Sequence, residues 1–432
     1  MENLKLIQQC LDYVEENLTT DITIEELSAK VGFSVFHFCH IFKFATGMGV
    51  MEYITKRRIL WAVYEITGGM KISDAALKYG FNTSAGFYKA FRKNFNCSPS
   101  FYAKRYKKHK PYRIDLYKEE HIMLTEKNLR NILKVWNIKN CEIKNIIYES
   151  TGEINDHSFL VDNRYYLKVF TNLGTVKRNI DIQLALLNKE LPAVLPILTK
   201  DNEEYFTDGE LYFILTEKVK GKPLLGTEVF ADNYEKKAYY IGEIVGKLHT
   251  ALKNQNDITI STKDIFKEVT DEWLQKAERV MNIPCDITEA YLSYTEKYKD
   301  KLPIEVIHRD LNPSNMLMDN FNLTGFIDFD LSQKSIRIFD PCYLATGILC
   351  DSISQLSEAE LDKWPTIFKN IIKGYDSVAH LTDEEKLMTP FVLLNIELIC
   401  VGFFSTQEKF TSALDTNVKM TEFILKKWNE IL

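Results

Sequence analysis

An internal repeat near the start of the chain constrains its fold more than any other feature. When the sequence is offset by about 49 residues, one aromatic pattern matches another: Phe38, Phe42, Gly49 and Tyr53 fall on Phe87, Phe91, Ser98 and Tyr102. One residue earlier in register, Gly32-Phe33 falls on Gly80-Phe81. In each copy the glycine permits a tight turn, and the phenylalanines of the following helix pack the helices at a fixed angle. The repeat predicts two helix-turn-helix units.

Apolar residues at helical spacing extend this pattern to a series of short helices separated by glycines. The predicted helices are Leu4 to Leu18, Ile24 to Val31, Ser34 to Ala45, Met51 to Ile66, Ile72 to Tyr79 and Thr83 to Phe95. The fourth is long enough to join the two units as one continuous helix. A basic stretch follows, broken by Pro111, and predicts a linker over residues 107–124.

From about residue 141 the pattern changes to strands. Ser158 to Phe170 predicts a hairpin that turns at Asp162-Asn163, and Leu211 to Val219 predicts a further strand. Helices return from Asn233 onward, interrupted by two short strands around Asn315 to Phe329. This order predicts an α+β half with two lobes, residues 125–220 and 221–432.

Length and composition fit a soluble protein of several domains. The 432 residues exceed what one core holds, and 45% hydrophobic with 26% charged residues is typical of globular chains. The longest apolar run, Phe391 to Phe404, carries Glu397 and is shorter than the roughly 18 residues of a membrane span. The N-terminus lacks the pattern of a signal peptide. Eight cysteines without a CxxC pair indicate reduced thiols, so we expect a cytoplasmic protein that contacts no membrane.

Charge is distributed unevenly along the chain. Residues 1–113 contain 17 Lys and Arg against 10 Asp and Glu, a net of +7, whereas residues 114–432 contain 37 against 50, a net of −13. A basic head on an acidic body indicates that only the head meets a polyanion such as duplex DNA.

The most specific motif is IHRDLNPSNMLMDNFNLTGFIDFD at residues 307–330. It supplies two candidate catalytic residues, His308 and Asp310, then Asn315 five residues after Asp310 and Asp328 thirteen after that. Phosphoryl transfer from ATP needs a carboxylate near the acceptor hydroxyl and oxygen ligands for Mg²⁺. Asp310 suits the first role, whereas Asn315 and Asp328 suit the second. A turn at Asp319-Asn320 between the two strands would bring both metal ligands to the same end of a hairpin.

Candidate nucleotide-binding residues lie upstream of this motif. Lys168 lies on the second strand of the predicted hairpin, where it could reach the α- and β-phosphates. The turn from Gly152 to Ser158, which includes Asn155, could cover the phosphates. Backbone groups near Glu217 and Val219 could hydrogen-bond adenine.

The first 106 residues resemble the DNA-binding domain of the AraC/XylS regulators. The stretch ISDAALKYGFNTSAGFYKAFRKNFNCSPSFY at residues 72–102 carries the resemblance. It implies two recognition helices, Ser34 to Lys43 and Asn82 to Arg92, in successive major grooves of double-stranded DNA. The first helix departs from the family, because bulky Phe36 stands where small polar residues are usual.

The recognition helices supply two groups of DNA-binding candidates. Expected base readers are Val35, His37, His40, Thr83, Ser84, Tyr88 and Lys89, although the two histidines could equally be surface polar residues. Expected phosphate partners are Lys43, Arg58, Arg92 and Lys93.

Residues 125–432 resemble the aminoglycoside phosphotransferase superfamily, which includes choline and homoserine kinases, and look nearest to the homoserine-kinase-like branch. Besides the motif at 307–330, the resemblance rests on GEINDHSFLVDNRYYLKVF at 152–170, IGEIVGKLH at 241–249 and GYDSVAHLTDEEK at 374–386. It implies a two-lobed protein-kinase-like fold that binds ATP and Mg²⁺. It also implies that Asp340 braces the catalytic loop, unless this residue is simply a helix N-cap.

One departure from this family lies after the hairpin, where a glutamate should pair with the strand lysine. Gln183 occupies the likeliest position and Asp181 lies nearby. The expectation is therefore a multidomain chain: an all-α double helix-turn-helix domain followed by an α+β two-lobed kinase-like domain.

Three functions fit this architecture. The first is a transcription regulator that binds ATP-Mg and phosphorylates a small hydroxylated molecule. The second is a ligand-sensing regulator with a catalytically inactive domain. The third is a small-molecule kinase with an autoregulatory DNA-binding head. The acidic second half slightly favours an amine-bearing ligand.

Overall fold

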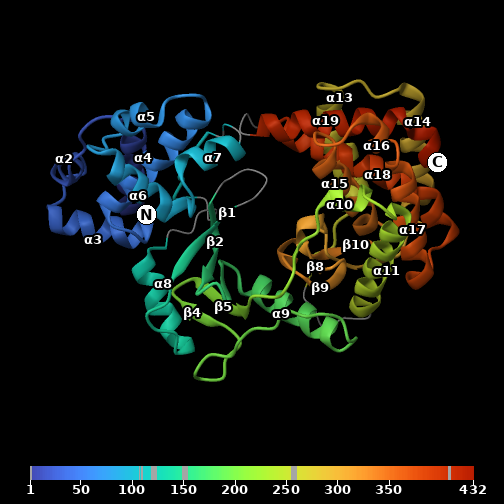
Figure 1. The fold of residues 1–432 in the computed structure, drawn as a ribbon, viewed down its shortest axis with the longest axis horizontal. Helices are drawn as coiled ribbons and strands as arrows, with labels where there is room; N and C mark the ends of the chain where they lie inside the picture. Colours follow the sequence, from blue (N-terminus) through green and yellow to red (C-terminus); the bar gives the residue numbers. More distant parts are fainter. Residues whose placement is uncertain are drawn as a thin grey trace. The chain divides into compact units, whose positions relative to one another are not determined.

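The computed structural model describes residues 2–106, 108, 110–117, 124–147, 154–253, 260–406 and 410–432. Residue contacts divide the chain into two compact units (Figure 1). The N-terminal unit consists of Met1–Leu173 and Pro196–Lys218, and the C-terminal unit of Gly174–Leu195 and Val219–Leu432. The predicted helix-turn-helix region and the predicted strand-rich lobe thus fall in one unit.

The helices of the repeat form the first part of the N-terminal unit (Figure 1, blue). They are α1 (Glu2–Glu16), α2 (Ile24–Lys30), α3 (Val35–Thr46), α4 (Val50–Thr67), α5 (Ile72–Lys78), α6 (Ser84–Phe95) and α7 (Pro99–Arg105). Matching phenylalanines from the two copies, Phe38 and Phe42 with Phe87 and Phe91, are buried together in one core. The helical repeat predicted from the sequence is therefore confirmed.

Turn and cap residues fix where the second helix of each helix-turn-helix unit begins. Gly32 and Gly80 have φ of 71° and 76°, a left-handed conformation that few other residues adopt easily. Ser34 caps α3 by accepting a hydrogen bond from the amide of His37 at 3.3 Å. Thr83 caps α6 in the same way, accepting from Gly86 at 3.1 Å.

A five-stranded antiparallel sheet forms the rest of the N-terminal unit, in the order β1-β2-β3-β5-β4. Its strands are β1 (Ile143–Ile147), β2 (Ile154–Val161), β3 (Tyr165–Phe170), β4 (Phe206–Asp208) and β5 (Leu211–Glu217). The predicted hairpin is β2–β3, with Asp162 and Asn163 in left-handed turn conformations. Helix α8 (Glu126–Leu133) and a 3-10 turn (Lys134–Trp136) share an apolar core with the strands.

The pairing of β1 with β2 contains an irregularity. Asn145 pairs with Phe159, but the next residue, Ile146, pairs with Asn155. Residues 156–158 therefore bulge out of the ladder with β1, and such bulges redirect side chains. Ile147 and Ile154, which pair with each other on one side of this bulge, pack against the helical core, so the helices and the sheet are physically joined.

The C-terminal unit is mainly helical. Its helices are α9 (Leu173–Leu187, from its second residue), α10 (Gly226–Phe230), α11 (Tyr234–Leu252), α12 (Ile265–Glu268), α13 (Leu274–Glu278), α14 (Cys285–Tyr298), α15 (Phe339–Ser352), α16 (Glu358–Leu361), α17 (Trp364–Ala379), α18 (Asp383–Phe404), α19 (Thr411–Lys426) and α20 (Trp428–Ile431). Two small antiparallel sheets, β6-β8-β9 and β10-β7, complete it. Their strands are β6 (Lys222–Pro223), β7 (Ile304–Ile307), β8 (Met316–Asp319), β9 (Asn322–Phe326) and β10 (Gln333–Ile336).

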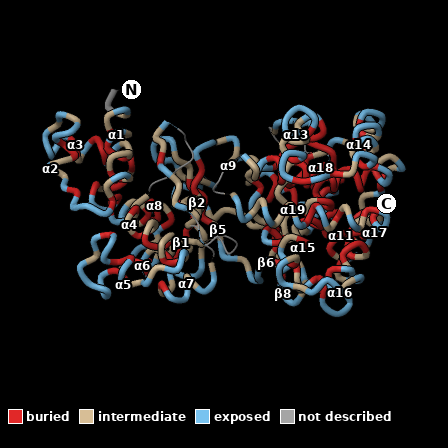
Figure 2. Tube along the Cα trace, turned by 90° about the horizontal axis from the view of Figure 1, so that it is seen from above, coloured by how far each residue is buried: buried red, intermediate tan, exposed pale blue. Residues whose placement is uncertain are grey.

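Helix α18 lies in the core of this unit (Figure 2). Among the described residues it is the single helix long and apolar enough to cross a membrane, yet most of it is buried by its neighbours. Core helices of soluble proteins have this character. All eight cysteines of the chain are free.

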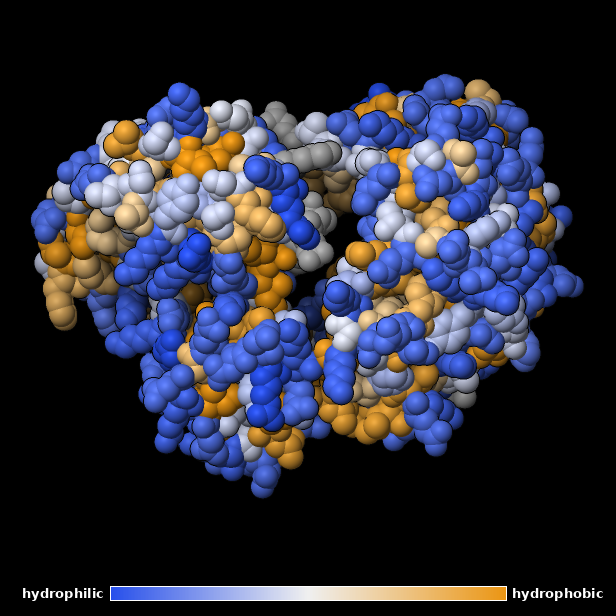
Figure 3. All heavy atoms as spheres, viewed as in Figure 1, coloured by the Kyte–Doolittle hydropathy of each residue, from blue (hydrophilic) through white to orange (hydrophobic). Residues whose placement is uncertain are grey.

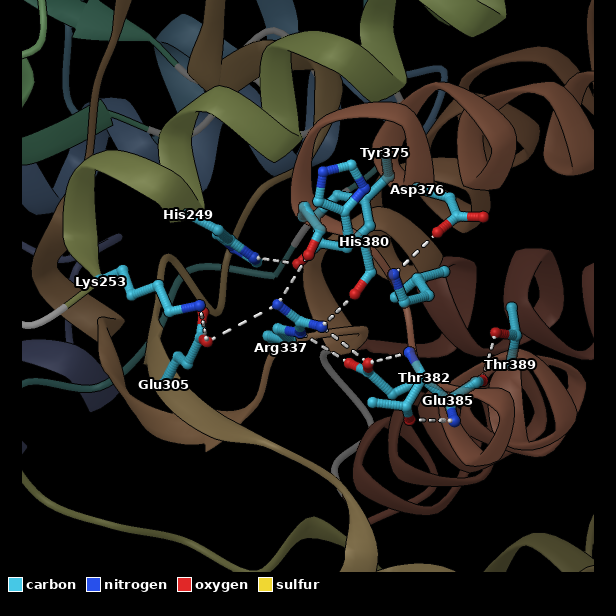
Figure 4. A network of polar contacts seen from close by, with 12 residues as sticks. His249, Lys253, Glu305, Arg337, Tyr375, Asp376, His380, Thr382, Glu385 and Thr389 are labelled. Carbon is cyan, nitrogen blue, oxygen red and sulfur yellow. Dashed lines mark hydrogen bonds and ion pairs between the residues drawn. The ribbon is translucent and has the colours of Figure 1, made fainter.

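A buried polar network ties the end of β10 to the start of α18 (Figure 4). Arg337, 5% exposed, donates two hydrogen bonds to the Glu385 carboxylate, at 2.7 and 2.8 Å. The same guanidinium donates to the backbone carbonyls of Ala379 and His380. Bidentate pairing compensates the cost of burying both charges, so this network fixes the loop between α17 and α18.

Candidate active site and nucleic-acid interface

The predicted catalytic loop follows β7 and is held by one buried carboxylate. Asp340, fully buried as the second residue of α15, accepts hydrogen bonds from the backbone amides of His308 at 2.7 Å and Arg309 at 2.9 Å. Complete burial opposes its charged form, but hydrogen bonds from His249 and from the loop hold the pKa of the Asp340 carboxyl below its ordinary value. The loop is thereby fixed relative to α15.

Two residues that the sequence did not single out support this carboxylate. The Nε2 atom of His249 lies 2.9 Å from Asp340. Its Nδ1 atom lies 2.7 Å from the Tyr375 hydroxyl (Figure 4). Both residues are buried, so the hydrogen bonds from Tyr375 through His249 to Asp340 link α17 through α11 to α15 and the loop. Both residues lie in quoted motifs: His249 ends the run 241–249 and Tyr375 is the second residue of the run 374–386. That position was the only signal in the sequence.

Asp310 lies in this loop with its carboxylate oriented by three neighbours. Its Oδ1 accepts from the Tyr343 hydroxyl at 3.0 Å and from Asn312 at 3.2 Å, and its Oδ2 accepts from Asn315 at 3.2 Å. Burial raises the pKa of the Asp310 carboxyl, and the nearby Asp328 carboxylate raises it further, whereas His308 opposes the rise. A positioned carboxylate with a raised pKa suits orientation and deprotonation of an acceptor hydroxyl.

The two metal-ligand candidates lie at the same end of the β8–β9 hairpin. Asn315 directly precedes β8, and its backbone carbonyl accepts from the amide of Ile327, the residue before Asp328. The Asn315 amide nitrogen donates to Asp310, so its Oδ1 oxygen is the end suited to bind a cation. Asparagine and aspartate oxygens fit Mg²⁺, which takes few protein ligands and completes its shell with phosphates and water.

His308 has a different environment from Asp310. Its side chain is fully buried, its Nε2 lies 3.0 Å from the Ile327 carbonyl, and its ring packs on Phe329 at 4.4 Å. The imidazole therefore joins the catalytic loop to the segment that carries Asp328.

The nucleotide candidates of the N-terminal unit lie on the β2–β3 hairpin and at the end of β5. Lys168 pairs with Ser158 across the two strands. The Asn155 side chain accepts from the amide of His157 within the bulge, at 2.9 Å. Glu217, at the end of β5, is exposed and lies 3.7 Å from Arg164. Gly152 lies outside the described residues.

Gln183 and Val219 belong to the C-terminal unit. The buried amide of Gln183 donates to the carbonyl of Phe326 at 3.1 Å and accepts from the amide of Val194 at 2.7 Å. Both ends of this side chain therefore hold backbone within the unit. Val219 is half-buried.

Most DNA-binding candidates are exposed on α3 and α6. On α3 these are Val35, His37, His40 and Lys43, and at α6 they are Thr83, Ser84, Tyr88, Lys89, Arg92 and Lys93. Phe36 is 86% exposed beside them. The Arg58 guanidinium instead donates to the carbonyls of Leu18 and Thr20, at 3.0 and 2.6 Å, and so ties down the loop between α1 and α2.

Contacts between the helix-turn-helix region and the sheet could not be read from the sequence. Lys56 of α4 forms an ion pair with Asp156 in the β2 bulge, and the Tyr112 hydroxyl donates to the same carboxylate at 2.8 Å. Asn145 of β1 donates to the carbonyl of Asn94 at 3.0 Å, while Asn96 donates back to the carbonyl of Asn145 at 2.7 Å. The C-terminal end of α6 is thus fixed to β1.

Comparisons with known proteins match two successive segments of the chain to two different families. A family model described as a helix-turn-helix domain matches residues 27–105. The activator AarP of Providencia stuartii is 34% identical over 98 residues, which are 22% of this chain and 73% of AarP. The probable transcription factor PqrA of Proteus vulgaris is 36% identical over 98 residues, 22% of this chain and 80% of PqrA. The predicted AraC-type resemblance is confirmed.

The second half matches a different family. The model of the phosphotransferase enzyme family matches residues 150–365. A solved structure of a microcompartment-associated aminopropanol kinase is 15% identical and has a TM-score of 0.54, covering 71% of this chain and 98% of that one. This likeness shows the kinase-like fold, which confirms the predicted fold class. The chain belongs to the phosphotransferase enzyme family and carries an AraC-type helix-turn-helix domain of the transcription regulators within its first 105 residues.

Proposed function

We propose that the protein is a cytoplasmic DNA-binding transcription regulator whose phosphotransferase domain binds ATP-Mg and phosphorylates a hydroxyl group of a small molecule. The observation that carries the proposal is the organisation of residues 308–328 within one compact unit. Asp310 is oriented by Tyr343, Asn312 and Asn315, and its loop is anchored by Asp340. A carboxylate held in a fixed orientation on an anchored loop is what a phosphotransfer site requires.

The proposed reaction transfers the γ-phosphoryl group of ATP to the acceptor. Asp310 orients the hydroxyl and receives its proton, while the acceptor oxygen bonds to phosphorus and the bond from phosphorus to the β–γ bridging oxygen breaks, leaving ADP. Asn315 and Asp328 would hold Mg²⁺, which neutralises charge on the phosphates when bound. Lys168 would position the nucleotide, with Asn155, Ser158, Glu217 and Val219 around it.

For DNA binding, α3 and α6 would read successive major grooves of a duplex. Lys89, Tyr88 and Ser84 are exposed on α6 for base contacts, and Arg92 is exposed for phosphate contact. Regulation of DNA binding by the nucleotide would depend on the contact between the helix-turn-helix region and the sheet, because Asp156, next to Asn155, is paired with Lys56 of α4. A change in the conformation of the nucleotide-covering turn would therefore alter a contact of the DNA-binding region.

The acceptor would be a small hydroxylated molecule, with a slight preference for one that bears an amine. This preference rests on the net −13 of residues 114–432. A panel of amines, amino alcohols and aminoglycosides, screened for acceptor-dependent ATP consumption with wild type and Asp310→Asn, tests the proposal. Consumption by wild type alone supports it.

A ligand-sensing regulator without catalysis is the main alternative. It is favoured by Gln183, which stands where the family places a glutamate and whose amide is used by Phe326 and Val194. A third possibility, a kinase with an independent DNA-binding head, is disfavoured by the ion pair between Lys56 and Asp156. Measured ligand binding without any phosphate transfer to the panel would favour the sensor.

A further inference from the structure

The N-terminal unit contains a basic groove that extends beyond the helix-turn-helix region. It has a volume of about 780 Å³ and is lined by the last turns of α3 and α6, the start of α4, and α8 with the residues that follow it. Its basic side chains are Lys43, Lys93, Lys127, Arg130, Lys134 and Lys139, against the two acids Glu52 and Glu126. Figure 3 shows hydrophilic residues over this part of the unit, around α8 and below α6 in the view of Figure 1.

Packing of α8 explains why its basic face is available. The apolar side of the helix, Leu129, Ile132 and Leu133, is buried against the sheet, so its charged side lines the groove. Glu126 joins the two walls, because it pairs with Lys93 of α6 at 3.2 Å and with Arg130 at 2.7 Å. Lys127, Lys134 and Lys139 are exposed in the same groove.

We infer that this groove binds the phosphate backbone of duplex DNA, so that α8 of the phosphotransferase half is a third DNA-contacting element. The inference rests on the proposed DNA binding by α3 and α6. Lys43 and Lys93 come from the last turns of these two helices. The DNA backbone between the two major grooves that α3 and α6 enter would therefore pass along α8, which forms the opposite wall of the basic groove. An excess of Lys and Arg attracts a polyanion through counterion release.

The arrangement suits an extended polyanion better than a small phosphorylated ligand. A small-anion site usually has buried donors that converge on one point. Here the lysines of α8 and the segment after it are exposed and spread along an open groove. Lysine acts as a mobile point charge, which matches a backbone contact that carries no sequence information.

The test compares two double variants of the full-length chain that remove the same charge. Lys127→Ala/Lys139→Ala changes the groove, and Lys5→Ala/Lys200→Ala removes two exposed lysines of the same unit that do not line it. Affinity for a random-sequence duplex several helical turns long is measured over a range of salt, and melting curves check that both variants fold. We expect the groove variant to bind roughly tenfold more weakly and to lower the slope of log K against log salt by about 2. The control should match wild type.

Other outcomes separate this inference from the proposal on which it rests. If Arg92→Ala weakens DNA binding while the groove and control variants behave alike, the groove has no role and the inference fails alone. If wild type binds no duplex at any salt, DNA binding itself fails. A groove variant that loses binding of inorganic phosphate but keeps DNA affinity would assign the groove to a small anion and contradict the inference.

Discussion

Lys56 Nζ lies 2.9 Å from Asp156 Oδ1, and this ion pair joins the helix between the two helix-turn-helix units to the bulged strand β2. The two side chains are only 23% and 15% exposed, so the pair is less screened than a surface ion pair. Asp156 also accepts from Tyr112, which fixes its position. The DNA-binding region and the strand that would cover the nucleotide phosphates therefore share one charged contact.

We predict that this contact carries the linkage between nucleotide and DNA. If ATP-Mg changes DNA affinity by some factor, DNA must change ATP-Mg affinity by the same factor. Asp156→Asn should bring that factor close to one, whereas Glu272→Gln, which breaks an exposed ion pair with Lys276 in the C-terminal unit, should leave it unchanged. Titrations of DNA with and without ATP-Mg measure the factor. An unchanged factor in Asp156→Asn would place the linkage elsewhere or remove it.

Variants of α6 separate affinity from sequence preference. Arg92→Ala should weaken binding to all sequences because phosphate contacts carry no sequence information, whereas Lys89→Ala should alter preference among sequences. Thr83→Ala would also remove the cap of α6, at a cost of about 1 kcal/mol, so Thr83→Ser is the better variant for testing base reading. Selection from a random duplex library gives the profiles. Identical profiles for all variants would contradict the assignment of α6 as the reading helix.

The brace at Asp340 should be important for both stability and catalysis. Asp340→Ala leaves the buried amides of His308 and Arg309 and the His249 ring without their acceptor, which should lower the free energy of unfolding by about 3 kcal/mol and abolish transfer. Tyr375→Phe removes only the hydrogen bond between Tyr375 and His249, and should lower the free energy of unfolding by about 1 kcal/mol. Urea unfolding monitors both variants. Equal losses of unfolding free energy in the two variants would show that Asp340 is not the central acceptor of these hydrogen bonds.

Glu397 of α18 predicts a particular pH dependence of stability. Burial raises the pKa of this carboxyl from 4.5 to about 8, and a hydrogen bond from Thr421 opposes the rise only in part. Between these two pKa values the folded chain binds the proton more tightly than the unfolded chain does, so this residue's contribution falls as pH rises from about 4.5 to 8. Glu397→Gln, which is uncharged at every pH, should be more stable relative to wild type at pH 8 than at pH 5. A pH-independent difference in melting temperature would show that Glu397 does not titrate in this range.

The sequence predicted what depends on local pattern. The phenylalanine repeat, the turn at Asp162-Asn163 and the hairpin after Asn315 follow from spacing and turn chemistry, and the structure has each of them. The support of Asp340 by His249 and Tyr375 could not be predicted, because Tyr375 lies 126 residues from His249 and only the packing of α11 on α17 brings them together.

The contact between the helix-turn-helix region and the sheet could not be predicted, for the same reason. Asp156, which pairs with Lys56, lies in the bulge of β2 against β1, and no local pattern marks that bulge. The sequence indicated a linker over residues 107–124, yet Ile114 is buried in the helical core and Gln8 of α1 donates to its carbonyl at 3.0 Å. Ile114 therefore contacts α1, which a basic composition did not reveal.

Nucleotide affinity with and without Mg²⁺, measured together with single-turnover transfer, tests the central claim, an active phosphotransferase site, most directly. Wild type should bind ATP-Mg, and Asp310→Asn should bind it nearly as well while losing single-turnover transfer, because Asp310 acts mainly on the reaction itself. Asp328→Ala should lose the Mg²⁺-dependent part of binding, since a metal ligand already acts in the ground state. Wild type that binds no nucleotide under any condition, or binding that Asp310→Asn abolishes and Asp328→Ala retains, would contradict the account.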